Sequence, residues 1–488
     1  GQVPKGLAPV GGLSDQEIEA IARQIVAGLA GDGPPRPDRP ARPSVAGELG
    51  VFDHLDAAVR AARDAFIQLS GLGLQKRNVL LAAMRDAMRE HGRALAREAH
   101  EETGLGRYED KVLKNQLVTE KTPGTEDLQP QTVTGDHGLT LTEPAPYGVI
   151  GAITPTTNPT STIINNALGM IAAGNAVVFN VHPNARRVSC HTVALLNKAI
   201  LAAGGPRHLI TCLATPTLES AQALMRHPGI RLVVVTGGGG VVKAAMESGK
   251  RAICAGPGNP PVVVDETANL DQAARDIVFG ASFDNNIICA DEKACLVAAP
   301  VADKLIQGLI YHGAALVWKD QLPALEKVIF RKTRGPRAEA EMERALVGQD
   351  ASVILRKAGI ACADTVRLGI VEVGPDHPLL WTEQMMPILP LTRVRDADEG
   401  IDLAIALEHP RRHTFVMHSD NLSHLSRMAR ECDASIFVKN GPALAGLGWQ
   451  GEGHTSFTIA SPSGEGMTSP RSFSRWRRCA LVGAFRIV

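Results

Sequence analysis

An alternation of short apolar segments with amphipathic segments between residues 147 and 250 constrains the fold of this 488-residue chain most strongly. The apolar segments have the length of buried strands and are too short for helices. We predict strands at 149–154, 176–181, 209–213 and 232–235, and helices at 161–173, 188–203 and 218–226. Strands that alternate with helices in this way predict a doubly wound α/β fold around a parallel sheet.

A second α/β section follows the first along the chain. Its predicted strands lie at 262–264 and near 295–298, 370–373, 414–418 and 435–438. Helical patterns that precede the first section cover 55–69, 76–91 and 113–118. The segment 132–142, with the turn Gly135-Asp136-His137-Gly138, predicts a β-hairpin that interrupts the first section.

The first fifty residues differ in pattern from the rest. Residues 14–30 predict a short amphipathic helix, with Ser14 as its N-cap and Glu17 at the spacing of a capping box. Residues 31–50 are rich in proline, glycine and arginine and predict a flexible linker. A helix with an apolar face on such a linker favours a partner outside the folded core. The alternative is a terminal helix that packs on its own domain.

The charge balance and the cysteines argue against several classes of protein. Lysine and arginine together number 51, as do aspartate and glutamate, so there is no electrostatic reason to expect nucleic acid or an anionic membrane as partner. We find no apolar run of about 18 residues that could span a bilayer, and no signal peptide at the start. The eight cysteines form no CxxC pair, which indicates a reducing, cytoplasmic setting without a zinc site.

The segment FDNNIICADEK at 283–293 places Cys289 between a predicted helix at 270–282 and a predicted strand at 293–298. We expect a cysteine in a polar turn of this kind to be partly exposed and reactive. A nucleophilic cysteine acts as the thiolate, and needs nearby backbone N–H groups or dipoles that lower its pKa and hold an oxyanion. We therefore predict that Cys289 is a nucleophile, although most cysteines are simply small buried side chains.

Two other segments follow predicted strands directly, where ligands bind in α/β sheets. Asn158, in TPTTNPT at 154–160, has an amide that can donate to an anion, although asparagine before proline is also a common turn residue. The turn formed by Thr236 and the glycines at 237–240 lets a phosphate or cofactor approach backbone N–H groups at a helix N-terminus. This turn lacks GxGxxG spacing. The loop AGPGNPP at 255–261 is interpreted as a rigid link between the two sections.

The order of these segments, followed by WTEQMMP at 381–387, resembles the aldehyde dehydrogenase superfamily over residues 51–488. TPTTNPT, FDNNIICADEK and TEQMMP are most similar to its CoA-acylating branch, which contains the acetaldehyde and propionaldehyde dehydrogenases of bacterial microcompartments. The resemblance implies an α/β fold with a Rossmann-type cofactor-binding domain and an α/β catalytic domain. The implied ranges are 51–131 and 143–261 for the cofactor domain, 262–445 for the catalytic domain, and 132–142 with 468–488 for a small β oligomerisation arm.

The same resemblance implies partners. It predicts a homodimer or homotetramer, and it makes residues 1–30 an encapsulation peptide that binds microcompartment shell proteins. The protein would then lie in the cytoplasm, inside a bacterial microcompartment.

The resemblance also implies roles for individual residues. Cys289 matches the nucleophile, and Asn158 matches the amide of an oxyanion hole that includes the Cys289 backbone N–H. Glu383 falls where the family binds the nicotinamide ribose. His182 and Ala185 replace a lysine and an acidic residue near the adenine ribose, so NAD is expected and NADP is also compatible. The implied cofactor-binding residues are Thr154, Pro155, His182, Pro183, Thr236, Gly237, Gly238 and Glu383.

One departure from the family is informative about the acyl acceptor. Hydrolytic members carry a glutamate that activates water, whereas this chain has CAGPG at 254–258, with no carboxylate. Without a general base, water attacks a thioester slowly, while coenzyme A is a thiol that ionises near a pH of about 8.5. We therefore expect a short aldehyde, with propionaldehyde the first candidate, to form an acyl-cysteine and NADH. The acyl group then passes from the cysteine to CoA.

Two alternatives stay open on the sequence alone. One is a phosphate- or semialdehyde-type reductase on the same fold, which also uses one cysteine and no glutamate. The other is a shell-binding scaffold whose site is vestigial. His413 and His418 favour packing or cofactor-edge roles over acid–base catalysis, and the arginines at 471, 475, 477 and 478 favour a solvated or subunit-facing surface over a clamp for CoA phosphates.

Overall fold

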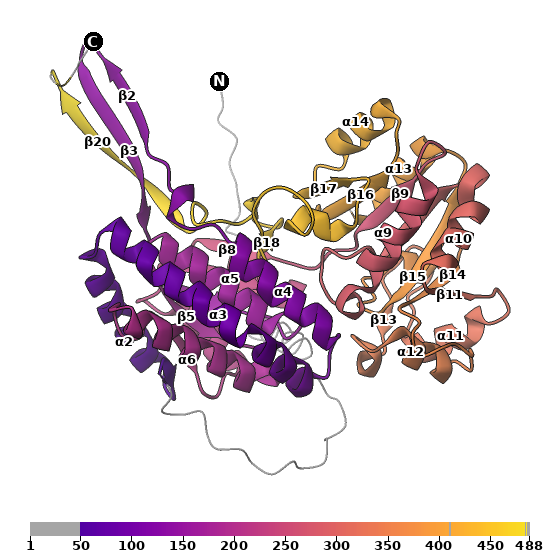
Figure 1. The fold of residues 1–488 in the computed structure, drawn as a ribbon, viewed down its shortest axis with the longest axis horizontal. Coiled ribbons are helices and arrows are strands. Elements are labelled where there is room, and N and C mark those ends of the chain that lie inside the picture. Colours follow the sequence, from indigo (N-terminus) through magenta and orange to yellow (C-terminus); the bar gives the residue numbers. More distant parts are fainter. Residues whose placement is uncertain (1–48, 409–410, 484, 486–488) are drawn as a thin grey trace, which may run out of the picture.

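The computed structural model describes residues 49–408, 411–483 and 485, which form two α/β lobes and a projecting arm (Figure 1). The predicted helix at 14–30 and all but the end of the predicted linker at 31–50 lie outside the described residues. Within the part of the chain that is described, no helix is both long enough and apolar enough to cross a bilayer.

A parallel sheet of six strands forms the centre of the first lobe. Its strands lie side by side in the order β1 (Val51–Phe52), β6 (Ile210–Leu213), β5 (Ala176–Asn180), β4 (Val149–Ile153), β7 (Leu232–Thr236) and β8 (Ala252–Ala255). Every residue of β4 to β7 is buried, which explains their continuous apolar sequences. These four strands were predicted, whereas β8 and the two-residue strand β1 were not.

The strand order of this sheet reverses at β4. The chain runs from β4 through β5 to β6, and then returns to add β7 and β8 on the other side of β4. Because such crossovers are right-handed, the reversal places α5 and α6 on one face and α7 and α8 on the other. Helix α3 packs on α5 and α6, α4 packs on α3 and α5, and α2 contacts α7.

The helices of this lobe confirm the predicted ones and lengthen two of them. The patterns at 76–91 and 113–118 belong to α3 and α4, which both extend well beyond the predicted limits. The bounds are α2 (Leu55–Ser70), α3 (Leu74–Thr103), α4 (Tyr108–Lys121), α5 (Pro159–Ala172), α6 (Arg186–Ala202), α7 (Leu218–Arg226) and α8 (Gly239–Met246).

The second lobe is built on a parallel sheet of seven strands. Their order is β11 (Ala314–Val317), β14 (Leu368–Glu372), β15 (Ile388–Val394), β10 (Ala294–Ala298), β9 (Pro261–Val264), β16 (Thr414–His418) and β17 (Ile436–Lys439). Strand β15 was not predicted, because Pro390 in its middle is atypical of a central strand. The helices are α9 (Leu270–Ser282), α10 (Ala302–Tyr311), α11 (Leu322–Ile329), α12 (Ala351–Lys357), α13 (Ala397–Glu408) and α14 (Leu422–Glu431).

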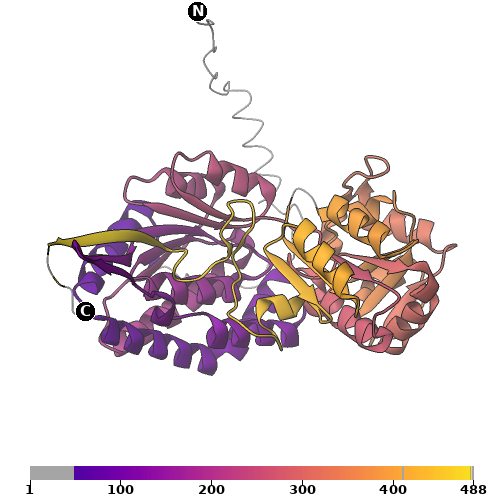
Figure 2. The ribbon, with the colours of Figure 1, turned by 90° about the horizontal axis from the view of Figure 1, so that it is seen from above.

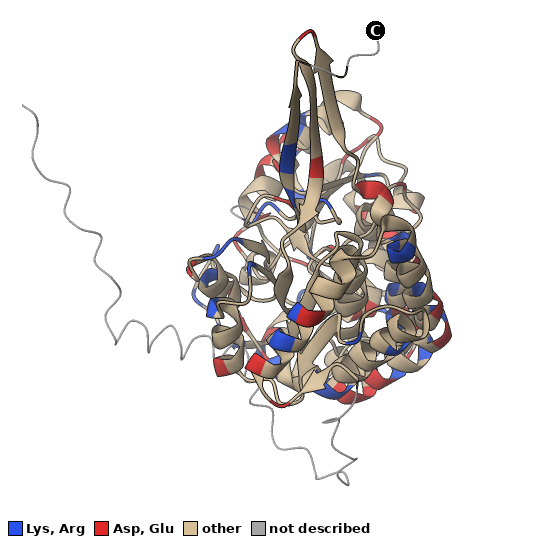
Figure 3. Ribbon diagram, turned by 90° about the vertical axis from the view of Figure 1, so that its left-hand side faces the viewer, with Lys and Arg blue, Asp and Glu red and all other residues tan. Residues whose placement is uncertain are grey.

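The predicted hairpin forms two strands of the arm, and the C-terminal segment supplies the third. Strands β2 (Gln131–Gly135), β3 (Gly138–Pro146) and β20 (Ser474–Val482) form an antiparallel sheet with β3 in the middle. Seen from above, the final segment passes from the second lobe along the first to reach the arm (Figure 2). Most of the arm carries no charged side chain (Figure 3).

The remaining elements are short. Two two-stranded sheets pair β12 (Phe330–Lys332) with β13 (Glu341–Met342), and β18 (Ile459–Ala460) with β19 (Gly466–Met467). The single-turn 3-10 helices are η1 (Thr125–Asp127), η2 (Pro183–Ala185), η3 (Phe283–Asn286), η4 (Ala299–Val301), η5 (Arg344–Leu346), η6 (Pro378–Trp381) and η7 (Ala443–Leu447). The predicted α/β fold is confirmed. The domain boundary predicted at 261/262 stays a prediction, close to where β9 begins.

Candidate active site

A cavity of about 240 Å³ lies between the two lobes, where the carboxyl edge of the first sheet meets the amino edge of the second. From the first lobe it is lined by residues that directly follow β4 and β7. From the second lobe it is lined by residues that precede β9, β10 and β15. The predicted site residues that line it are Thr154, Pro155, Asn158, His182, Thr236, Gly237, Gly238, Cys289 and Glu383. Pro183 is the exception, since it lies in η2 just beyond the cavity.

The turn before Cys289 is buried, although its sequence is polar. Asp284, Asn285 and Asn286 are buried and have positive φ angles of 44°, 56° and 65°. Aspartate and asparagine tolerate this left-handed conformation better than other non-glycine residues. Side-chain hydrogen bonds then hold the turn, as when Asn286 Nδ2 donates to the Ala281 and Glu292 carbonyls at 2.8 and 2.9 Å. Cys289 itself is half-buried, as expected for a thiol in a cavity wall.

Lys293 anchors the segment immediately before the cysteine. Its buried ammonium group donates to the Asn286 carbonyl at 2.8 Å, to Asn286 Oδ1 at 2.7 Å and to the Ile288 carbonyl at 2.9 Å. These three contacts use all the donors of a lysine. The position of Cys289 is therefore set by the buried Lys293 side chain as well as by the turn.

The electrostatics of Cys289 differ from the prediction that neighbours lower its pKa. Burial, with the nearby Glu383 carboxyl adding to it, raises the pKa of the Cys289 thiol to about 12, although Lys293 acts in the opposite direction. Burial also raises the pKa of the Glu383 carboxyl. The protein without ligand thus holds a neutral thiol, because a low-dielectric wall disfavours the thiolate.

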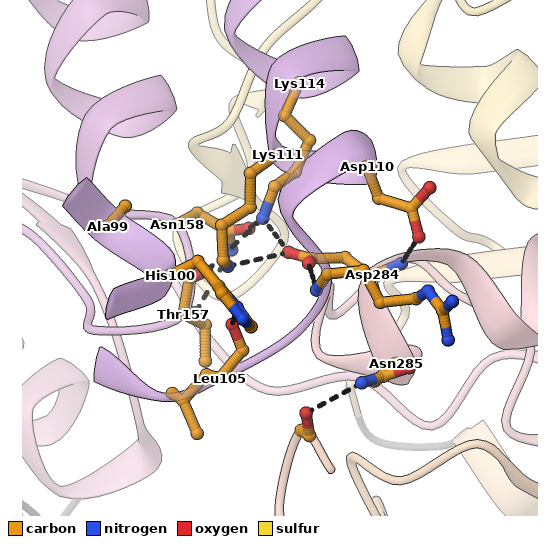
Figure 4. Close-up of polar contacts among 12 residues, drawn as sticks. Ala99, His100, Leu105, Asp110, Lys111, Lys114, Thr157, Asn158, Asp284 and Asn285 are labelled. Atoms are coloured by element: carbon orange, nitrogen blue, oxygen red, sulfur yellow. Dashed lines mark hydrogen bonds and ion pairs between the residues drawn. The ribbon is translucent and has the colours of Figure 1, made fainter. Parts of the chain in front are cut away.

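Asn158 lies at the carboxyl end of β4, at the N-cap position of α5. Its side chain does not cap the helix. Its Oδ1 accepts from Lys114 Nζ at 2.7 Å, and its Nδ2 donates to Thr157 Oγ1 at 3.1 Å (Figure 4). The amide is therefore available to the cavity that it shares with Cys289.

The glycine turn after β7 leaves space at the start of α8. A Cβ at Gly238 would meet no atom of the described residues within 4 Å, whereas one at Gly237 would lie 2.8 Å from Val241 Cγ1. Gly238 is the N-cap of α8, so backbone N–H groups at the positive end of a helix border the cavity. This is an arrangement that can accept a phosphate.

The loop after β8 is more than a link between lobes. Gly256 and Pro257 line the cavity, and the Gly258 N–H donates to Glu383 Oε1 at 3.3 Å. A Cβ on Gly258 would lie 2.6 Å from the Cys289 carbonyl, so only glycine fits there. The loop brings no carboxylate to the thiol, as its sequence predicts.

Unpartnered polar atoms and a neutral histidine complete the first-lobe wall of the cavity. Thr154 Oγ1 and Thr156 Oγ1 are buried and have no hydrogen-bond partner among the described residues, which leaves them for a polar ligand. His182 Nδ1 accepts from the Asn184 N–H at 3.1 Å, and burial lowers the His182 pKa to about 4. Together with the open glycine turn, these groups fit a dinucleotide.

Other candidate residues lie away from the cavity. His413 and His418 are buried in or beside β16 and do not line it, which agrees with packing roles. Arg471 contacts Asp127, while the arginines at 475, 477 and 478 lie on the arm strand β20. None of the four arginines lines the cavity.

The sequence interpretation missed the lysines at 111, 114 and 293 and the aspartate at 284. A signal for the first two existed. Lys111, Lys114, Asn115 and Val118 have the i, i+3, i+4, i+7 spacing of a buried helix face, and all four are buried in α4. Charged residues at that spacing indicate a polar contact inside the molecule, because a buried charge requires partners.

Comparison with known proteins places the chain among relatives that share this site region. Residues 48–457 match the aldehyde dehydrogenase family. The chain belongs to the aldehyde dehydrogenase family. It is 48% identical to the acetylating acetaldehyde dehydrogenase EutE of Salmonella typhimurium, over 98% of this chain and 100% of that protein.

Two solved structures of aldehyde dehydrogenases are similar along most of the chain. A Rhodopseudomonas palustris propionaldehyde dehydrogenase with bound CoA and an acylated cysteine is 47% identical with a TM-score of 0.87, and covers 90% of this chain and 99% of its own. A propionaldehyde dehydrogenase from the fucose utilisation microcompartment of Clostridium phytofermentans is 43% identical with a TM-score of 0.88, and covers 90% and 100%. The predicted resemblance to the CoA-acylating branch is confirmed.

Proposed function

We propose that this chain is a CoA-acylating aldehyde dehydrogenase, which converts a short aldehyde, CoA and NAD⁺ to acyl-CoA and NADH. The observation that carries the proposal is the cavity that joins Cys289, the Asn158 amide and the open glycine turn. A thiol, an oxyanion donor and a turn that can accept a cofactor phosphate are what an acyl-cysteine mechanism with a dinucleotide requires. Relatives that carry out acetylation and propionaldehyde oxidation support the same reaction.

In the proposed mechanism, the Cys289 thiol first loses its proton to solvent, a step that adds to the barrier because the thiol pKa is raised to about 12. The thiolate then attacks the aldehyde carbon, so that a C–S bond forms and the C=O π bond breaks to give an oxyanion. The Asn158 Nδ2 group and the Cys289 backbone N–H donate to the resulting oxyanion, and each such donor typically stabilises the transition state by about 2.7–4 kcal/mol. Bound NAD⁺ would supply the acceptor for the hydride that leaves the former aldehyde carbon. Cys289 then holds the acyl group as a thioester until the CoA sulfur attacks and the Cys289 sulfur leaves.

The structure supports CoA rather than water as the acyl acceptor. The described residues of the cavity wall include a single carboxylate, Glu383, and the Gly258 N–H holds one of its oxygens. The loop at 254–258 has no carboxylate to remove a proton from water. A thiol that ionises near a pH of about 8.5 needs less help than water does.

We also propose NAD as the cofactor, with NADP compatible. The low pKa of His182 leaves its side chain neutral at pH 7, so it adds no positive charge for a 2′-phosphate. Position 185 is an alanine rather than an acidic residue, so no negative charge at that position repels the 2′-phosphate.

The decisive experiment compares NADH formation from propionaldehyde and NAD⁺ with and without CoA. We expect continuous turnover with CoA. Without CoA we expect one equivalent of NADH per active site and an acylated protein in the intact mass spectrum. Cys289→Ala should form neither NADH nor the adduct. Steady NADH formation without CoA, or turnover by Cys289→Ala, would reject the mechanism.

The chain beyond the catalytic lobes also carries proposals. We propose that residues 1–30 bind shell proteins of a microcompartment and that the arm at 132–142 and 468–488 assembles the protein into a dimer or tetramer. One similar structure comes from a microcompartment enzyme. A chain that starts at residue 49 should keep kcat within about twofold, since the residues proposed for catalysis and cofactor binding all follow residue 49. It should no longer co-purify with co-expressed shell proteins. Loss of turnover would instead favour the scaffold alternative.

A further inference from the structure

A buried group of charged side chains joins helix α4 to both segments that carry the proposed chemistry (Figure 4). We call Asp110, Lys111, Lys114 and Asp284 the α4 charge cluster. Lys111 and Lys114 contribute side chains that are only 2% and 3% exposed, and Asp284 is fully buried in the turn before Cys289. The Asp284 backbone N–H donates to Asp110 Oδ2 at 2.9 Å, so α4 holds this turn through side chain and backbone.

Two lysines share one carboxylate in this cluster. Lys111 Nζ lies 3.1 Å from Asp284 Oδ2, and Lys114 Nζ contacts the same oxygen. The Arg107 N–H donates to Asp284 Oδ1 at 2.7 Å. Burial alone would raise the pKa of the Asp284 carboxyl, but Lys111 and Lys114 outweigh it and hold that pKa below its ordinary value. Asp284 is therefore ionised, and only one of the two lysines is needed to balance its charge.

Lys114 has contacts that Lys111 lacks. Its ammonium group also donates to Asn158 Oδ1 at 2.7 Å and to the Thr157 carbonyl at 3.3 Å. An ammonium group has three donors and no acceptor. The atom of the Asn158 amide that faces Lys114 must therefore be the oxygen, because the reverse orientation would place an NH₂ group against a cation.

This contact has two physical consequences for the amide. It fixes Nδ2, the only donor of the side chain, on the side away from Lys114, where one hydrogen reaches Thr157 Oγ1 and the other remains for the cavity. A cation on the amide oxygen also withdraws electron density, and so strengthens the N–H as a donor to an anion.

We propose that Lys114 is a positioning residue that orients and polarises the Asn158 amide for the oxyanion. The inference rests on the proposed function. Asp284, in turn, ties Lys114 to the turn that precedes Cys289. Lys114 and Asp284 thereby keep the oxyanion donor and the nucleophile segment in register, although they are far apart in sequence.

The test compares Lys114→Met with the matched variant Lys111→Met. Either substitution removes one buried ammonium group and leaves Asp284 paired with the other lysine, so both proteins should fold with similar losses of melting temperature. Lys114→Met should lower the rate of acyl-enzyme formation in a single turnover by at least about tenfold. Lys111→Met should lower it by less than about threefold, and neither should change the Kd for NAD⁺ by more than about twofold.

A double variant separates positioning from a general structural effect. If Lys114 acts through the amide, Lys114→Met combined with Asn158→Ala should be no slower than Asn158→Ala alone, for which a loss of about 10²–10³-fold is typical. The inference would be overturned if the rate loss of the double variant were the product of the two single losses. It would also be overturned if Lys111→Met and Lys114→Met lost the same rate.

Failure of the inference and failure of the proposed function give different results. If the wild-type chain turns over and Lys114→Met forms the acyl-enzyme at the same rate, the role of Lys114 is wrong and the proposed function stands. A wild-type chain without CoA-dependent turnover rejects the proposed function. The role of Lys114 is then decided by a crystal structure of Lys114→Met, in which the Asn158 amide should change rotamer or flip. An unchanged amide, held by Thr157 alone, would overturn it.

Discussion

At the scale of single residues, buried ionisable groups surround the nucleophile. Asp284, Asp291, Glu292 and Lys293 all lie within five positions of Cys289 and are fully buried. Each has at least one hydrogen-bond partner, such as the Ala443 N–H that donates to Glu292 Oε1 at 2.8 Å. Removing one partner from such a group leaves a polar atom unpaired in a dry interior, which is among the most destabilising changes a mutation can make.

Glu292 makes the stability of the protein depend on pH. Burial raises the pKa of its carboxyl from 4.5 to about 8, and its Oε2 has no partner among the described residues. The unfolded chain releases this proton at lower pH than the folded one. Its contribution to stability is therefore full below pH 4.5 and is lost as pH rises towards about 8.

We predict that, between pH 5 and about 8, the melting temperature of Glu292→Gln decreases less with rising pH than that of the wild-type protein. Glutamine keeps an oxygen for the Ala443 N–H and does not titrate. Burial also raises the pKa of Glu408 to about 8, so the variant should keep part of the pH dependence of the melting temperature. Differential scanning calorimetry at each pH measures this, with the exposed Glu247→Gln as control. A variant with the wild-type slope would contradict the prediction.

At the scale of elements, the site forms because several elements end or begin at one place. Strands β4 and β7 end at the cavity, as expected for the point where strand order reverses in an open α/β sheet. The second lobe contributes from the opposite edge, since Cys289 precedes β10 and Glu383 precedes β15. The rule that ligands bind at carboxyl edges therefore locates only half of this site.

The start of α8 gives a prediction for cofactor binding. A Cβ at Gly238 meets open space, so Gly238→Val should fold normally and keep its melting temperature. The added side chain should occupy the approach to the α8 N-terminus and raise the KM for NAD⁺ by about tenfold or more, while kcat changes less. Gly374→Val is a matched control, because a Cβ there also meets no atom within 4 Å and Gly374 does not line the cavity. An unchanged KM in Gly238→Val would place the cofactor elsewhere.

At the scale of the whole molecule, the arm exposes apolar side chains away from the body of the protein. Val133, Leu481 and Val482 are 70%, 46% and 86% exposed. Strands β2 and β20 are the two edges of its sheet among the described residues. An exposed apolar sheet with open edges is typical of a surface that another chain covers.

We predict that the protein is an oligomer and that Val133→Asp combined with Leu481→Asp converts it to a 51.7 kDa monomer. Two buried charges at an apolar interface would be left unpaired. Light scattering coupled to size-exclusion chromatography measures the mass. Tyr311→Asp, at a position 83% exposed on α10 in the second lobe, should leave the mass unchanged. An unchanged mass in the double variant would exclude the arm as the interface.

The sequence by itself determined the local parts of this protein. Buried parallel strands need continuous apolar runs, so β4 to β7 and β16 were predictable. The segments around Asn158 and Cys289 showed at which strand ends polar groups gather. The family followed from the same segments. Strands interrupted by proline, such as β15, and strands of two residues, such as β1, gave no such pattern.

Only the tertiary structure decided which polar groups meet and which are buried. Cys289 lies in a polar sequence, yet the surrounding turn is dry and the thiol pKa is raised. Lys114 is 44 positions from Asn158 and 170 from Asp284, and contacts both. Burial and long-range pairing depend on how the two lobes and α4 close around the cavity. That geometry arises from packing between distant segments, which the order of residues along one segment does not express.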